Sequence, residues 1–218
     1  MGKSLWYTIT DRGDTMQYLL IVLLGYLLGC SNMAYWMSKI KKVDIRSNGT
    51  GNLGASNAAV LLGWGAGVIV AAHDIGKAFV AVLLAKILFP ELELAGALAG
   101  VACVMGHIYP FYLKFKGGKG LASLIGAVIA LDWRVALAVA ILLVAVTVLT
   151  DFIALGTISV SLATPVGLWI TTHNWLIALI LAVATVVMIF KHLENIKRIC
   201  NKTEIGLFST IKGENRVK

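Results

Sequence analysis

The chain has 218 residues, of which 59% are hydrophobic and only 14% are charged. Soluble domains usually carry about 25% charged residues, so this composition excludes an ordinary soluble domain and predicts an integral membrane protein. The net charge of +8 comes from lysines and arginines in short segments beside apolar runs, which is typical of membrane topology and anionic lipid contact and argues against nucleic-acid binding.

The apolar runs predict an all-α polytopic membrane protein with about seven transmembrane helices, some of them short or broken. The first run, Met16 to Met37, is too long for the core of a signal peptide, and it predicts a membrane helix near Tyr18 to Ser38. Lys39, Lys41 and Lys42 follow this helix. Positive charge favours the cytoplasmic side, so the following loop is predicted to be cytoplasmic and the N-terminus outside.

The second apolar region, Ala58 to Phe89, is too long for one ordinary span and is interrupted by polar residues. It predicts a short dipping helix followed by a spanning one. Asp74 and Lys77 are costly in such a stretch unless they are paired or face a polar cavity, so they are predicted to have a functional role. The remaining predicted helices are Leu94 to Leu113, Leu121 to Leu131, Val135 to Thr150, Phe152 to Thr172 and Trp175 to Phe190.

The helix Leu121 to Leu131 has roughly 16 Å of length at 1.5 Å per residue, about half a bilayer. Counting the crossings places the C-terminus in the cytoplasm, in agreement with the basic residues after the last helix. The chain is predicted to form one domain over residues 1–218, with an external polar tail at 1–15 and a cytoplasmic tail at 205–218. Three polar loops are then predicted on the cytoplasmic face.

The loop Phe115 to Gly120 has the sequence Phe-Lys-Gly-Gly-Lys-Gly between two apolar segments. Its glycines would let an anion approach the backbone N–H groups, while Lys116 and Lys119 neutralise the charge. The helix that begins at Leu121 would direct its positive dipole end to the same place. These features predict a phosphate site that includes Gly117, Gly118 and Gly120. The alternative is a basic loop that only fixes topology.

The loop Arg46 to Asn57 contains a G-x-G-x-x-G spacing, but it follows a membrane helix rather than a strand, so we reject a dinucleotide fold. Its backbone and its hydrogen-bonding side chains suit a polyol phosphate. The candidate ligands in this loop are Arg46, Thr50, Gly51, Asn52, Gly54, Ser56 and Asn57. The alternative is a flexible linker in which Ser56 or Asn57 caps the next helix.

The third loop begins at Lys191 and reads Lys-His-Leu-Glu-Asn-Ile-Lys-Arg. If the preceding helix continues, His192 and Asn195 face the same side while Glu194 points elsewhere. His192 could then accept a proton, and Asn195 could hold a phosphate or hydroxyl oxygen. The alternative is a membrane-surface turn with basic anchors.

Together these motifs resemble the bacterial membrane family of acyl-phosphate:glycerol-3-phosphate acyltransferases. The family pattern has Asp-Ile-Arg, Ser-Gly-Asn-x-Gly-Ala-Thr-Asn, Asp-x-x-Lys, His-x-x-Pro, Phe-Lys-Gly-Gly-Lys-Gly, His-x-Glu-Asn-Ile-Lys-Arg and Thr-Glu. The matching residues are Asp44-Ile45-Arg46, Thr50 to Asn57, Asp74 with Lys77, His107 with Pro110, Phe115 to Gly120, His192 to Arg198, and Thr203-Glu204. The resemblance covers nearly the whole chain, from about Leu19 to Glu204, and several separated motifs in the right order argue against chance.

The chain departs from the family pattern at a few positions. Thr50 and Ser56 exchange the family's Ser and Thr, which keeps a hydroxyl group at each place. Val60 stands where the family usually has an arginine, so one phosphate-binding cation is missing. Cys30-Ser31-Asn32 replaces a Ser-x-Pro pattern, and Asp151 replaces a basic residue.

The resemblance implies transfer of a fatty acyl group from acyl phosphate to the 1-hydroxyl of sn-glycerol 3-phosphate, the first step of phospholipid synthesis. It implies catalytic roles for Lys116, Lys119, His192 and Asn195. It implies substrate contacts by Arg46, Thr50, Gly51, Asn52, Gly54, Ser56, Asn57, Asp74, Lys77, His107, Gly117, Gly118 and Gly120. Acyl phosphate is already activated, so neither a covalent enzyme intermediate nor a cofactor or metal is expected.

The resemblance also implies a place in the bacterial inner (plasma) membrane with the site on the cytoplasmic face, and contact with membrane lipid and with the soluble enzyme that makes acyl phosphate. Two other hypotheses remain open at this point. Broken helices and basic glycine loops also build anion pathways, so a transporter or channel for a phosphate-bearing anion is the main alternative. A membrane anchor for a partner protein is the third, and it leaves the glycine loops unexplained.

Overall fold

The computed structural model describes residues 12–211, with side chains from residue 14 to 209. All regular elements in this part of the chain are helices, and it contains no strand. They are α1 (Arg12–Cys30), α2 (Met33–Ile40), α3 (Ala55–Leu62), α4 (Trp64–Leu88), α5 (Ala95–Ile108), the 3-10 turn η2 (Phe111–Leu113), α6 (Leu121–Leu131), α7 (Trp133–Thr150), α8 (Ile153–Thr172), α9 (Trp175–Cys200) and α10 (Leu207–Ile211).

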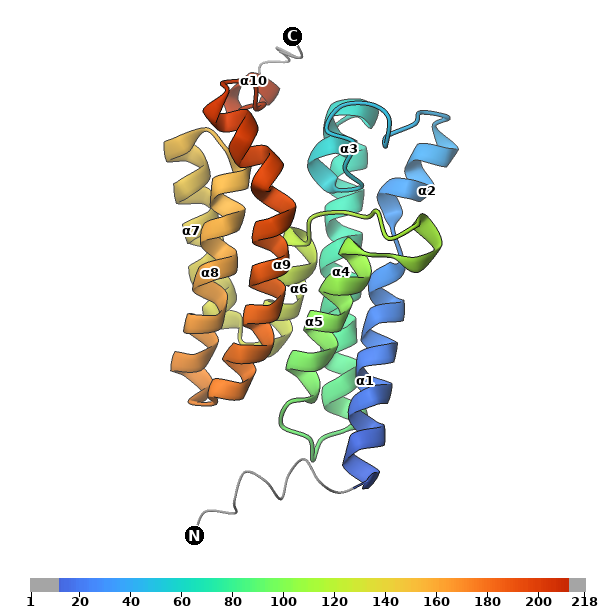
Figure 1. Ribbon diagram of the computed structural model, residues 1–218, viewed down its shortest axis with the longest axis vertical. Helices are drawn as coiled ribbons and strands as arrows, with labels where there is room; N and C mark the ends of the chain where they lie inside the picture. The colour runs from blue at the N-terminus through green and yellow to red at the C-terminus, as the bar shows by residue number, and fades with distance from the viewer. Residues whose placement is uncertain (1–11, 212–218) are drawn as a thin grey trace.

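The bundle has the length and composition of a membrane protein. Within the described residues, 6 segments are long and apolar enough to cross a membrane, and the apolar helix α6 is shorter. The predicted all-α polytopic fold, with a short helix among its spans, is thereby confirmed. In Figure 1, α1 begins at the end opposite to the one that holds α2, α3 and α10. Which end faces the cytoplasm stays a prediction.

The sequence suggested that the first apolar run forms one helix. The structure instead breaks this helix at Ser31 and Asn32. The Asn32 side chain caps α2 by accepting a hydrogen bond from the Tyr35 N–H at 2.9 Å. The Lys77 ammonium group donates to the Ser31 carbonyl at 2.7 Å, which satisfies a backbone group that the break would leave unpaired.

The second apolar region divides into a short helix and a spanning one, as predicted. The division falls at Gly63, whose φ of 93° is a left-handed conformation that favours glycine. Small residues then let the long helices approach closely, as is common in membrane bundles. A Cβ at Gly106 of α5 would lie 2.1 Å from the Tyr26 carbonyl oxygen of α1, and one at Gly126 of α6 would lie 2.0 Å from the Ile75 carbonyl oxygen of α4.

The last long helix extends further than the sequence suggested. It continues past Phe190 to Cys200 without interruption, so the basic segment after the apolar run is helical rather than a turn. The chain then folds back, and residues 205–207, which the sequence assigned to the C-terminal tail, line a cavity. Of the other residues in the predicted tails, 12–15 belong to α1 and 208–211 to α10, whereas 1–11 and 212–218 lie outside the described residues.

Candidate active site

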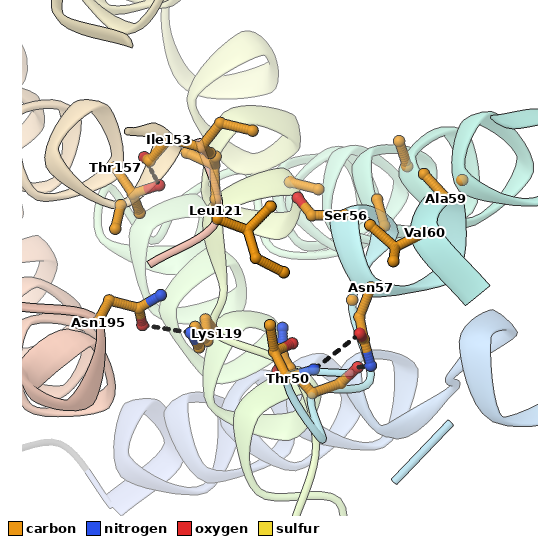
Figure 2. A pocket seen from close by; sticks show the side chains of 18 of the residues that line it. Thr50, Ser56, Asn57, Ala59, Val60, Lys119, Leu121, Ile153, Thr157 and Asn195 are labelled. Atoms are coloured by element: carbon orange, nitrogen blue, oxygen red, sulfur yellow. Dashed lines mark hydrogen bonds between the residues drawn. The ribbon is translucent and has the colours of Figure 1, made fainter. Parts of the chain in front are cut away.

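A cavity of about 370 Å³ is lined by residues of α3 and of the segment that leads into α10. In Figure 1 these two helices lie at the same end of the bundle. The walls of the cavity come from α3, α4, the start of α6, α8, α9 and the segment before α10 (Figure 2). The polar and charged residues that line it are Thr50, Asn52, Ser56, Asn57, Asp74, His107, Lys119, Thr157, His192, Asn195 and Glu204. The apolar part of the wall includes Val60, Trp64, Val68, Leu121, Ile153 and Leu207. The site therefore joins hydrogen-bonding groups to a surface that suits a hydrocarbon chain.

A chain of polar contacts connects residues 115–120, called here the glycine-lysine loop, to Glu204 in the segment that follows α9. The Lys119 ammonium group donates to the Asn195 side-chain oxygen, as Figure 2 shows. The Asn195 amide in turn donates to Glu204 Oε1 at 2.6 Å, and Arg198 Nε donates to Glu204 Oε2 at 2.6 Å. Asn195 thus has its oxygen fixed on the lysine and its nitrogen fixed on the carboxylate, so Lys119 is held in place at the cavity wall.

Lys119 carries the charge best placed to meet an anion in the cavity. Its removal from water lowers the pKa of the Lys119 ammonium group to about 8, and the positive charge of Arg198 acts in the same direction. Glu204 opposes the shift. Lys119 is therefore mostly charged at neutral pH but would lose its proton in mildly alkaline solution.

His192 faces the cavity in a defined tautomer. Its Nδ1 lies 2.7 Å from the Met188 carbonyl oxygen, which can only accept a hydrogen bond. In the neutral ring Nδ1 therefore carries the hydrogen, and Nε2 has the free lone pair. Because α9 continues, His192 and Asn195 do lie on one side, as predicted, and Glu194 is exposed and does not line the cavity. His192 Nε2 is thus the atom that can accept a proton.

The polar loop before α3 is organised by Asn57. Its side-chain oxygen accepts from the Thr50 N–H at 3.0 Å (Figure 2), and its nitrogen donates to the carbonyl oxygens of Ile45 and Asn52, each at 3.0 Å. Asn57 is therefore committed to the fold of the loop, and it places Thr50 at the cavity rather than serving as a helix cap. Gly54 occupies the cap position of α3 without a side-chain hydrogen bond.

Asp74, Lys77 and His107 form a buried polar cluster beneath the glycine-lysine loop. Lys77 Nζ lies 2.7 Å from Asp74 Oδ1 and 2.9 Å from His107 Nδ1. Asp74 and Lys77 are thus paired, which is one of the two arrangements that the sequence left open, and their functional role stays a prediction. Asp74 and His107 line the cavity, whereas Lys77 lies behind them.

Gly117 and Gly118 are needed in this loop for a different reason from the one that the sequence suggested. The N–H groups of Gly117 and Gly118 already donate to the carbonyl oxygens of Ile108 and His107, at 3.0 and 3.1 Å. The expectation that they present free N–H groups to a phosphate is therefore wrong. A Cβ at Gly118 would lie 2.0 Å from His107 Nε2, so packing against the histidine requires a glycine there. Gly120, whose φ is 98°, does line the cavity.

The structure sorts the remaining candidates by position. Arg46, Gly51 and Lys116 are exposed and do not line the cavity. Val60 does line it, so the position at which the resemblance would place an arginine is an apolar part of the wall (Figure 2). The described residues contain no group of three His, Cys, Asp or Glu residues that could hold a metal ion.

Some residues at the cavity were missed by sequence reasoning. Thr157, buried in α8, had no local signal, because its hydroxyl only donates to the Ile153 carbonyl one turn earlier. Glu204 stood in a matched motif, and its role becomes visible only when the chain folds back onto Asn195. Asp151 holds this returning segment: its carboxylate accepts from the Phe208 N–H at 2.8 Å.

In this polytopic helical protein a half-buried lysine, a histidine with an available ring nitrogen and an apolar wall meet at one cavity, and these features are typical of a membrane enzyme that acts on an amphiphilic anion. The family model for glycerol-3-phosphate acyltransferase matches residues 19–202. The chain belongs to this glycerol-3-phosphate acyltransferase family.

Individual relatives agree over nearly their full lengths. Glycerol-3-phosphate acyltransferase 1 of Oceanobacillus iheyensis is 39% identical over 205 residues, which cover 89% of this chain and 97% of the relative. The Bacillus subtilis glycerol-3-phosphate acyltransferase is 34% identical over 186 residues, which cover 85% of this chain and 95% of the relative.

Solved structures show the same fold. The crystal structure of PlsY (YgiH), an integral membrane glycerol 3-phosphate acyltransferase, in its glycerol 3-phosphate form aligns with a TM-score of 0.83 at 31% identity. That alignment covers 88% of this chain and 96% of the PlsY chain. The lysophosphatidic acid form of PlsY aligns with a TM-score of 0.79, also at 31% identity.

Proposed function

We propose that this protein transfers a fatty acyl group from acyl phosphate to the 1-hydroxyl of sn-glycerol 3-phosphate, giving 1-acyl-sn-glycerol 3-phosphate and phosphate. The observation that carries the proposal is the meeting of Lys119, His192 and Asn195 at one cavity that also has an apolar wall. The family match favours this transferase over the transporter or channel considered from the sequence. The acyl chain would lie against the apolar wall, with the phosphates at the polar residues.

The proposed reaction is a direct transfer. The 1-hydroxyl oxygen attacks the acyl carbon, the bond from that carbon to the phosphate oxygen breaks, and phosphate leaves with the electron pair. Lys119 would stabilise the negative charge that develops on the leaving phosphate. His192 Nε2 has the lone pair to accept the hydroxyl proton, and a substrate phosphate is the alternative acceptor. Asn195 would position Lys119 rather than react.

The loop of Thr50 and Ser56 would hold the polar part of the acceptor. Hydroxyl groups and backbone N–H groups at the start of α3 are suited to a polyol phosphate. We place this end of the bundle on the cytoplasmic side of the bacterial inner membrane, since the basic residues after α2 and α9 gather there. Acyl phosphate would then come from a soluble enzyme of the cytoplasm.

The direct test uses the purified protein with palmitoyl phosphate and glycerol 3-phosphate. We expect phosphate release that depends on both substrates, together with lysophosphatidic acid detected by mass spectrometry. Lys119→Gln should lower kcat/KM by about 10- to 100-fold, because a charge-assisted hydrogen bond to phosphate is lost. Lys116→Gln is the matched control: its lysine is exposed and off the cavity, so the change should stay within about threefold. Phosphate release that does not need glycerol 3-phosphate would contradict the proposal.

The orientation has its own test. In a Cys200→Ser background, which removes the exposed native cysteine, single cysteines are placed at Ser47 and Glu91. Impermeant reagents added outside intact cells should label the cysteine at 91, whereas the one at 47 should react only after permeabilisation. Reversed labelling would place the cavity on the outer side.

A further inference from the structure

A second group of reactive side chains begins outside the cavity, where α1 ends. Ser31 Oγ is 2.9 Å from His73 Nε2, and His73 Nδ1 is 3.4 Å from Asp74 Oδ1. The order is nucleophile, base and orienting carboxylate, which is the arrangement that activates a serine hydroxyl. Neither Ser31 nor His73 lines the cavity.

The tautomer of His73 follows from its partners. An ionised carboxylate can only accept hydrogen bonds, so the proton of the neutral ring lies on Nδ1, toward Asp74. Lys77 Nζ, 2.7 Å from Asp74 Oδ1, favours the ionised carboxylate. His73 Nε2 is then the acceptor that faces the Ser31 hydroxyl. The serine proton therefore has a base in hydrogen-bond contact.

The backbone around Ser31 is fixed and carries positive potential. Lys77 Nζ donates to the Ser31 carbonyl at 2.7 Å, which anchors the break between the two helices. Helix α2 begins at Met33, two residues later, so the N–H groups of its first turn and the positive end of its dipole lie beside Ser31. Donors of this kind stabilise the oxyanion that forms when a serine attacks a carbonyl.

Ser31 is exposed, and it continues a row of exposed leucines on α1. Leu20, Leu24 and Leu27, at 43%, 46% and 46% exposure, precede it at helical spacing and face the lipid. The 19 residues of α1 span about 28 Å, close to the thickness of the hydrocarbon layer, so Ser31 lies near its boundary. A hydrocarbon chain along these leucines would bring its carbonyl group to Ser31.

We propose that Ser31, His73 and Asp74 form a lipid-facing serine esterase site that takes the acyl group of an amphiphilic carboxylic ester. Ser31 Oγ forms a bond to the acyl carbon, the bond from that carbon to the alcohol oxygen breaks, and the serine proton passes through His73 to the leaving alcohol. Water then attacks the acyl-serine, His73 takes the water proton and returns it to Ser31, and the fatty acid leaves. The net reaction is ester plus water to acid plus alcohol. It needs no metal and no glycerol 3-phosphate.

The test uses the full-length protein in lipid nanodiscs and a long-chain alkyl fluorophosphonate, which reacts with activated serines. Mass spectrometry should find the adduct on Ser31 in the unchanged protein, and His73→Gln should slow the labelling at least about a hundredfold. Hydrolysis of 4-nitrophenyl decanoate should be lost in Ser31→Ala. It should persist in Ser159→Ala, a control whose hydroxyl only donates to the Leu155 carbonyl.

Labelling of the unchanged protein tests the site even if a variant does not fold. Absence of an adduct on Ser31, or ester hydrolysis that persists in folded Ser31→Ala, would overturn the proposal. Acyl transfer to glycerol 3-phosphate, measured on the same samples, should persist in Ser31→Ala because this serine lies off the cavity. Loss of that transfer would place Ser31 in the main reaction and would overturn a separate site.

Discussion

The activity of this protein should fall in alkaline solution, because Lys119 loses its positive charge there. Burial lowers the pKa of this lysine to about 8, whereas an exposed lysine titrates near 10.4. A group with this pKa is about nine-tenths charged at pH 7 and about one-tenth charged at pH 9. Only the charged form attracts phosphate, so we expect kcat/KM to fall about tenfold between pH 7 and pH 9.

The substrates themselves do not explain such a fall. The second ionisation of a phosphate monoester lies near pH 6, so its charge is complete throughout this range. A bound anion favours the charged lysine and raises its pKa, so the fall in kcat at saturating substrate should occur at higher pH than the fall in kcat/KM. The separation of the two profiles would show that the titrating group contacts substrate.

The assay measures initial phosphate release in detergent from pH 6.5 to 10, after subtraction of the enzyme-free hydrolysis of acyl phosphate. Lys119→Arg is the matched control, because a guanidinium group stays charged above pH 12 and its profile should lose the alkaline fall whatever its absolute rate. A wild-type inflection near pH 10.5, or the same fall in Lys119→Arg, would refute the reasoning.

Two further predictions concern packing around the site. Gly118→Ala should lower kcat/KM about tenfold or more, because the added methyl group would lie 2.0 Å from His107 Nε2. Gly76→Ala is the control: a Cβ at Gly76 has no atom within 4 Å, so this variant should be tolerated. Equal rates for both variants, at matched amounts of folded protein, would contradict the packing argument. Asp151→Ala should lower kcat/KM by about three- to tenfold, because the Phe208 N–H loses its hydrogen-bond acceptor. Asp151→Asn keeps a side-chain oxygen as acceptor, so its kcat/KM should remain close to that of the wild type. If Asp151→Asn is as impaired as Asp151→Ala, the carboxylate charge rather than this hydrogen bond is what matters.

The sequence by itself determined which segments form membrane helices. A span must satisfy its own backbone within the hydrocarbon, so length and apolar character are local properties that can be read directly. The short helix Leu121–Leu131 was predicted with the bounds that the structure has. The cost of burying either charge alone indicated that Asp74 and Lys77 are paired or face a polar cavity, and the structure shows the pair. The family motifs likewise indicated the three segments that hold most of the polar residues of the cavity wall.

Only the tertiary structure decided which side chains of those segments reach the cavity. Lys116 and Lys119 look equivalent in sequence, but Lys114 and Phe115 adopt positive φ values of 56° and 58°, which non-glycine residues rarely do and which no sequence pattern announced. The turn leaves Lys116 exposed and brings Lys119 to Asn195. Glu204 joins them because the chain folds back after α9. Such contacts depend on residues far apart in sequence, and a local pattern carries no information about them.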